Sequence, residues 1–203
     1  MDRQRHRAAM IGPAAITRTA SVGKALVAAL AGLAIAACAV DPAAPASGVP
    51  DQLAPSAQAS LAMIAKSRGV QIYRCRQSAD RSGTYEWAFV APEADLFDAR
   101  GDNIGRHFAG PAWESRDGSR IVGTVQSRSD APAADAIPWL LLTAKATGPE
   151  GAFSKVTQVQ RLNTAGGNAP STGCAASADG TTVRVPYVAD YYFWKPGAVY
   201  SSY

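Results

Sequence analysis

The sequence of 203 residues contains few residues that bind metals, with only two histidines, His6 and His107, and three cysteines. Zinc and copper sites in proteins are built from several histidine or cysteine side chains, so a transition-metal centre is not expected. Calcium takes oxygen ligands instead, but no acidic loop here has the spacing that calcium loops require. The composition therefore predicts no metal site.

Motifs that mark common enzyme classes are also missing. No G-x-G-x-x-G turn links a strand to a helix, which argues against a bound dinucleotide. No G-x-S-x-G marks a nucleophilic serine. We therefore expect no cofactor, and a role without catalysis is favoured over an enzymatic one.

The charge of the chain is unevenly distributed. The formal net charge is +4, but residues 1–37 hold five of the 20 basic residues and one of the 16 acidic ones. From Cys38 onward this leaves 15 residues of each sign, and a net charge of zero. Because nucleic-acid binding requires clustered lysine and arginine, we expect no nucleic-acid partner.

Residues 1–37 have the features of an export signal. The first 24 residues are basic, with Met10 as an alternative start, and an apolar run follows from Ala25 to Ala37. This run is too short for a membrane span, which needs about 20 apolar residues, and it matches the core of a secretory signal. It ends in Ile35-Ala36-Ala37-Cys38, which resembles the lipobox of bacterial lipoproteins. The alternative is ordinary cleavage nearby, which would release a soluble secreted protein.

The lipobox resemblance implies cleavage before Cys38 and attachment of lipid, including palmitate, to that cysteine. Two or more acyl chains give stable membrane anchoring. Ala39 follows the cysteine where an aspartate would be expected in an inner-membrane protein, so the resemblance favours an outer-membrane lipoprotein that faces the periplasm. Residues 38–55 are rich in alanine and proline and predict a tether, and residues 56–203 predict a single domain.

Two cysteines remain once Cys38 carries lipid. In an oxidising compartment this even number indicates a disulfide between Cys75 and Cys174. The alternative is a pair of buried free thiols.

Alternating residues and turns predict an all-β domain. Tyr85, Trp87 and Phe89 alternate with smaller or polar residues, as in a half-buried strand, and Trp139–Leu142 is apolar on both faces, as in a doubly covered strand. Gln58–Ser67 is read as a strand that leads into a hairpin at Ser67-Arg68-Gly69, with a helix as the alternative. Other expected strands are 70–76, 120–126, 153–162, 182–187 and 191–194. Short strands separated by turns favour an antiparallel β-sandwich or small closed barrel, with one short helix at most.

Several separated motifs resemble one bacterial and fungal family. They include Gly69-Val70-Gln71-Ile72-Tyr73-Arg74-Cys75, the stretch from His107 to Ser119, Ala136-Ile137-Pro138-Trp139, Gln160-Arg161-Leu162-Asn163-Thr164 and the closing Asp190-Tyr191-Tyr192-Phe193. From about residue 49 to 196 the chain is similar to the family catalogued as domain of unknown function 3455. The resemblance implies an exported protein and brings no established reaction.

Candidate site residues lie mainly between His107 and Asp117. His107 with Glu114 or Asp117 is a candidate pair for general acid–base catalysis, because burial and hydrogen bonding can bring such pKa values near neutrality. The alternative is structural, with Trp113 in the core, Glu114 paired to an arginine and Asp117 in a hairpin turn. Trp113, Arg161 and Asn163 are candidate ligand-binding residues.

These observations lead to two functional hypotheses. The first is a binding or structural module of the cell envelope, anchored to the membrane through Cys38, with a small molecule, a glycan or an envelope protein as its ligand. The second is a periplasmic hydrolase that uses His107 with Glu114 or Asp117. A cavity that gathers His107, Trp113, Glu114 and Arg161 would favour ligand binding or catalysis.

Overall fold

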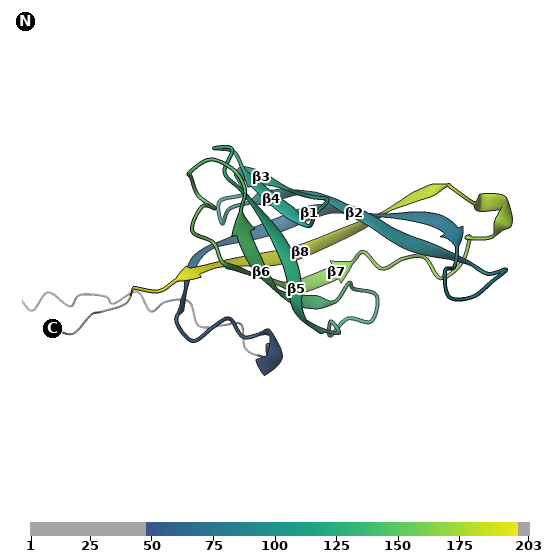
Figure 1. Ribbon diagram of the computed structural model, residues 1–203, viewed down its shortest axis with the longest axis horizontal. Helices are drawn as coiled ribbons and strands as arrows, with labels where there is room; N and C mark the ends of the chain where they lie inside the picture. Colours follow the sequence, from purple (N-terminus) through teal and green to yellow (C-terminus); the bar gives the residue numbers. More distant parts are fainter. Residues whose placement is uncertain (1–47, 199–203) are drawn as a thin grey trace, which may run out of the picture. The chain divides into compact units, whose positions relative to one another are not determined.

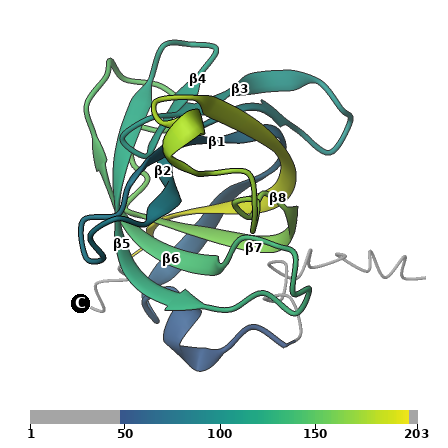
Figure 2. The same ribbon diagram turned by 90° about the vertical axis from the view of Figure 1, so that its right-hand side faces the viewer.

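The chain folds into a closed ring of eight antiparallel strands in a computed structural model, which describes residues 48–198. Each strand pairs with the next, and β8 pairs with β1 to close the barrel, as Figure 2 shows from one end. The strands are β1 (Ala59–Gln77), β2 (Tyr85–Phe97), β3 (Asn103–Phe108), β4 (Ala112–Ser115), β5 (Arg120–Ser129), β6 (Trp139–Ala146), β7 (Gln158–Gly166) and β8 (Thr182–Pro196).

Two short 3-10 turns, η1 (Asp51–Leu53) and η2 (Ala176–Ala178), complete the elements of the described part. No helix within residues 48–198 has the length and hydrophobicity needed to cross a membrane. The predicted signal segment and Cys38 lie outside the described residues.

The all-β prediction is confirmed, and of its two alternatives the structure is the closed barrel. Closure depends on β1 and β8, which pair along Ala59–Arg74 and join the two ends of the domain. Figure 1 shows β1, β2 and β8 extending together beyond the ring. Closing the sheet leaves the ring without an unpaired edge strand.

The strand predicted at Gln58–Ser67 is present, but the hairpin predicted at Ser67-Arg68-Gly69 is wrong. β1 continues straight through these residues to Gln77. A side chain at Gly69 would overlap the Glu93 carbonyl oxygen and Ala94 on β2, so the glycine permits close approach of two strands and makes no turn.

Two further strand predictions differ from the structure in their extent. The segments expected at 182–187 and 191–194 are parts of one strand, β8, and the strand expected from Phe153 begins at Gln158. Phe153 lies instead in the β6–β7 loop, where it is fully buried against Phe193 with ring centroids 4.7 Å apart.

The β6–β7 loop plugs one end of the barrel. Phe153 and Val156 from this loop join the main core with Trp113 and Ile121. Asp117 Oδ2 accepts a hydrogen bond from the Ala152 N–H at 2.7 Å. The hydroxyl of buried Ser119 accepts one from the Phe153 N–H at 3.1 Å. The β4–β5 turn thus holds the plug in place.

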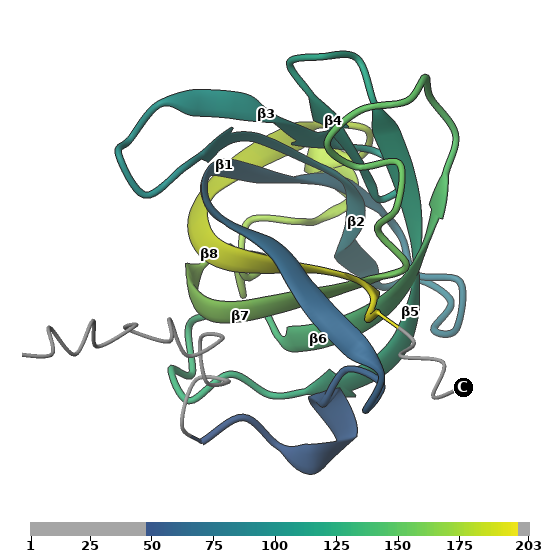
Figure 3. The same cartoon turned by 90° about the vertical axis from the view of Figure 1, so that its left-hand side faces the viewer.

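A second, smaller core lies outside the ring, where η1 packs on β6 and β7. Leu53, Trp139, Leu141 and Leu162 form it, and the Gln160 side chain donates to the Leu53 carbonyl at 2.7 Å. Figure 3 shows η1 lying outside the ring. The doubly covered strand predicted at Trp139–Leu142 is confirmed, and Leu53, which the sequence placed in the tether, belongs to the packed domain.

The predicted disulfide between Cys75 and Cys174 is present. It joins β1 to the β7–β8 loop, residues 167–181. The same loop accepts hydrogen bonds from Tyr73 Oη, at the Gly167 carbonyl, and from Trp87 Nε1, at the Thr172 carbonyl, at 2.7 and 2.9 Å. Three links therefore hold this loop against β1 and β2.

Candidate functional site

The end of the barrel opposite the plug contains a cavity of about 670 Å³. Its volume falls within the range of roughly 300–1,000 Å³ that is typical of small-molecule sites. Most of the lining is apolar and aromatic, with Tyr73, Phe89, Trp113 and Tyr191 from four different strands. The cavity is the candidate functional site.

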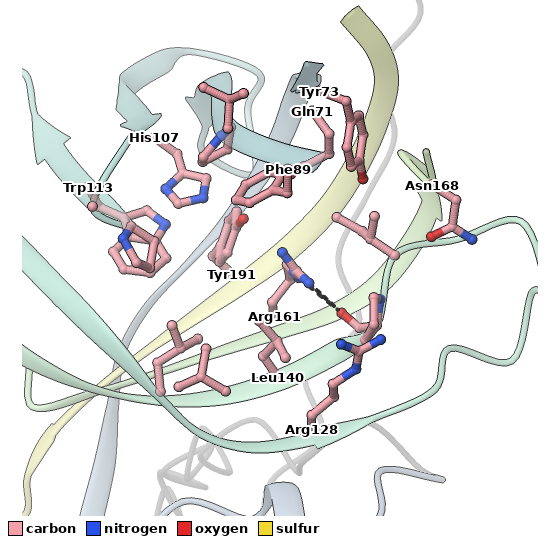
Figure 4. Close-up of a pocket in the computed structure, with 18 of the residues that line it drawn as sticks. Gln71, Tyr73, Phe89, His107, Trp113, Arg128, Leu140, Arg161, Asn168 and Tyr191 are labelled. Carbon is pink, nitrogen blue, oxygen red and sulfur yellow. Dashed lines mark hydrogen bonds between the residues drawn. The ribbon is translucent and has the colours of Figure 1, made fainter. Parts of the chain in front are cut away.

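Strand register sets the polar side chains of the cavity in place. Arg128, Leu140, Arg161 and Tyr191 are direct neighbours across β5, β6, β7 and β8, and all four line the cavity. Residues directly opposite in antiparallel strands share a face, so this row crosses the interior of the barrel. His107 on β3 enters the cavity from the other side, as Figure 4 shows.

His107 is buried and held in one orientation. Its Nδ1 lies 2.9 Å from the Ala112 carbonyl oxygen, which only accepts hydrogen bonds, so Nδ1 carries the proton and Nε2 is the acceptor. The ring stacks on Trp113 at 4.5 Å and meets Tyr191 edge-on at 5.1 Å. Burial lowers the pKa of His107 to about 3. The imidazole is therefore neutral near pH 7.

Arg161 brings a positive charge to the cavity. Its Nε and Nη2 donate to the Pro138 carbonyl at 3.0 and 2.8 Å, the contact drawn in Figure 4. No aspartate or glutamate lines the cavity, and within residues 48–198 Arg161 forms no ion pair. Burial raises the pKa of Tyr191, and the nearby charge of Arg161 opposes that rise. Arg161 and Tyr191 are direct neighbours across β7 and β8, so their side chains share one face of the sheet.

Three buried polar atoms of cavity-lining residues have no hydrogen-bond partner. They are Gln71 Nε2, Trp113 Nε1 and the Tyr191 hydroxyl. Each of these residues is at most 2% exposed. An unpaired buried polar group costs about 1–3 kcal/mol, so most such groups in proteins have a partner.

The mouth of the cavity is apolar. Phe89, Val90 and Val125 line it and are 56%, 49% and 51% exposed. A β-bulge between β1 and β2 leaves Val90 without a direct partner on β1. The bulge allows the consecutive residues Phe89 and Val90 both to line the cavity. The alternation at Tyr85, Trp87 and Phe89 correctly predicted a strand, although Phe89 is more exposed than the expected half-buried face.

The structure does not bring the predicted acid–base residues together. Glu114 follows Trp113 on β4 and therefore points out of the barrel, where it forms ion pairs with Arg106 and Arg120. Asp117 accepts hydrogen bonds from Ser119 and from the plug loop. Neither carboxylate lines the cavity with His107, so the proposed catalytic pairs are not assembled.

Of the three predicted ligand-binding residues, Trp113 and Arg161 line the cavity, whereas Asn163 does not. Asn163 is exposed and donates to Asp190 Oδ2 at 2.9 Å. The prediction missed Gln71, Tyr73 and Tyr191. The signal was available on β8, where Tyr187, Ala189, Tyr191 and Phe193 lie two residues apart, so that they share one face, and all four are buried. Gln71 and Tyr73 lie two residues apart, on one face of β1.

The fold and the site together define an antiparallel β-barrel domain, plugged at one end and open through an apolar mouth at the other. The model of the family described as "Protein of unknown function (DUF3455)" matches residues 55–195, and the chain belongs to this family. No curated protein matches the chain, and no solved structure does.

Proposed function

We propose that this protein is a lipid-anchored envelope protein that binds one small, largely apolar molecule inside its barrel. The observation that carries the proposal is the 670 Å³ cavity, which is lined mainly by apolar and aromatic side chains. Closed barrels of eight antiparallel strands have an interior of about the size of one small ligand. The anchor rests on the sequence from Ile35 to Cys38.

Binding is supported over catalysis by the state of His107. Burial lowers the pKa of this imidazole to about 3, which makes it a weak base, and no carboxylate of the described residues lines the cavity to raise that pKa. The second hypothesis, a hydrolase with Glu114 or Asp117, loses support because both carboxylates are engaged outside the cavity.

The proposal is tested by blocking the mouth of the cavity. Val125→Trp places an indole at an exposed lining position, and Val188→Trp is the matched control at a position that is 42% exposed and outside the cavity. The probe is 2-naphthamide, a neutral molecule with an apolar ring body, and binding is measured by isothermal titration calorimetry. The lipidated chain is held in phosphatidylcholine vesicles, with empty vesicles as the blank.

We expect the wild-type chain and Val188→Trp to bind one equivalent of probe with similar affinity. Val125→Trp should weaken binding by about tenfold or more, because the indole fills the space through which the probe enters. Equal binding of the probe by Val125→Trp and Val188→Trp would show that the probe binds outside the cavity, which would contradict the proposal. Absence of binding by the wild type to both 2-naphthamide and its acid, 2-naphthoate, would refute the proposed function.

A further inference from the structure

We infer that the ligand of this cavity carries an anionic acid group, a carboxylate or a similar oxyanion, which binds deep in the barrel at Arg161. This inference rests on the proposed function and specifies its ligand class. It follows from the polar groups that β1, β4, β7 and β8 contribute to a cavity whose wall is otherwise mainly apolar.

The charged side chains of the cavity are all positive. The lining contains two arginines, Arg128 and Arg161, and no carboxylate. Arg128 is exposed at the mouth, where water screens it, whereas Arg161 is half-buried and lies beside the buried Tyr191. A half-buried guanidinium without an ion-pair partner is partly shielded from water, and an anion that enters the cavity would supply that partner.

Arg161 also has N–H groups that could donate to a ligand. A guanidinium has five N–H donors. Nε and Nη2 each use one on the Pro138 carbonyl, and no bond from Nη1 is formed within the described residues. The contact with Pro138 fixes the plane of the guanidinium and leaves other N–H groups for a ligand. A planar guanidinium held in this way is suited to an acid group with two oxygens.

The unpaired polar groups of the lining residues can all act as hydrogen-bond donors. Gln71 Nε2 and Trp113 Nε1 are donors, and the Tyr191 hydroxyl can donate. Lining groups of this type match a ligand rich in acceptors and do not match an ammonium group. Figure 4 shows Trp113, Tyr191 and Arg161 near one another on the inner side of the cavity.

The aromatic lining indicates the rest of the ligand. Phe89 and Tyr73 meet edge to face at 5.8 Å near the mouth, and Trp113 stacks with His107 further in. Such walls favour a body with flat apolar faces. The expected ligand is therefore an acid with a ring-containing apolar body, oriented with its acid group inward.

The experiment compares 2-naphthoate with 2-naphthamide, which have the same shape and differ in charge. Both are titrated by calorimetry into the full lipidated chain in phosphatidylcholine vesicles, with empty vesicles as the blank. In the wild type we expect 2-naphthoate to bind about tenfold or more tightly than the amide, because hydrogen bonds between charged groups are the stronger kind.

Substitutions then assign the preference to Arg161. Arg161→Met should abolish the preference for 2-naphthoate over 2-naphthamide, mainly by weakening the binding of 2-naphthoate. Arg161→Lys should retain part of this preference. Arg128→Met, which removes the exposed arginine of the same cavity, should keep most of the preference for the acid. If Arg161→Met fails to fold, Tyr191→Phe provides the second test and should weaken 2-naphthoate by roughly threefold to tenfold, with little change for the amide.

Two results would overturn this inference. One is equal affinity of the wild type for acid and amide, and the other is a preference for the acid that survives in folded Arg161→Met. In both cases the amide still binds and is still excluded by Val125→Trp, so the proposed function stands. If neither probe binds the wild type, the proposed function itself fails, and the ligand class fails with it.

Discussion

His107 and Trp113 face each other across the β3–β4 pair with their rings nearly parallel, 11° apart in plane and 4.5 Å apart at their centroids. The stacking, together with the bond from Nδ1 to the Ala112 carbonyl, fixes the imidazole on the cavity wall. Trp113 belongs to the core that ends at the plug, so the ligand cavity and the core share one wall.

The buried state of His107 makes stability depend on pH. Burial lowers its folded-state pKa to about 3 from the ordinary value of 6.5. Between these values the unfolded chain binds a proton that the folded chain does not, so stability is lost as pH falls below 6.5. We expect the free energy of unfolding, measured in urea, to be lower by about 1.4 kcal/mol at pH 5.5 than at pH 7.5.

The control for this prediction is His107→Gln, whose stability should change little between the same two pH values. Hydrogen bonds that the Asp117 carboxylate accepts from Ser119 and from the Ala152 N–H lower its pKa to about 2, against the opposing effect of burial, so that carboxyl contributes only at more acidic pH. A pH slope of the same size in His107→Gln would contradict the assignment to the imidazole.

The disulfide should stabilise both the domain and the loop at the cavity mouth. In the unfolded chain without reductant, Cys75 and Cys174 should not react with an alkylating reagent, and both should react after reduction. The double variant Cys75→Ala/Cys174→Ala should lower the free energy of unfolding by about 2–4 kcal/mol. Two reactive thiols before reduction, detected by mass spectrometry, would contradict the pairing.

Ser119 should contribute to stability by holding the plug. Ser119→Ala removes the acceptor of the Phe153 N–H and leaves that buried group unpaired. The free energy of unfolding should fall by about 1–3 kcal/mol. Ser171→Ala, at an exposed position of the β7–β8 loop, should change it by less than about 0.5 kcal/mol. Equal effects of the two substitutions would show that the plug does not depend on this bond.

Cys38 should be the attachment point to the membrane. Cys38→Ala is expected to release the chain from membranes in a fractionation experiment and to abolish labelling by radioactive palmitate. The variant Cys75→Ala/Cys174→Ala is the matched control and should keep both properties. Unchanged membrane association of Cys38→Ala would rule out the lipid anchor.

Local patterns in the sequence determined a large part of the fold. Side chains alternate in a strand with a period of two, so Tyr85–Phe89 and Trp139–Leu142 could be recognised as strands from neighbours alone. The same rule places Glu114 on the face opposite Trp113, and it could have excluded Glu114 from any site that Trp113 lines. The two cysteines other than Cys38 allow only one pairing with each other, so the sequence could predict which disulfide would form, and the structure shows that it does.

The tertiary structure decided how the strands pair and which side chains meet. Ala59 lies beside Pro196 because β8 closes on β1, and no local pattern records a contact between residues so far apart in the chain. When the sheet closes into a barrel, every second residue of each strand faces the interior. The register between β7 and β8 then places Arg161 beside Tyr191. Arg161 could be named as a candidate from the sequence, but its position in a carboxylate-free cavity depends on the ring.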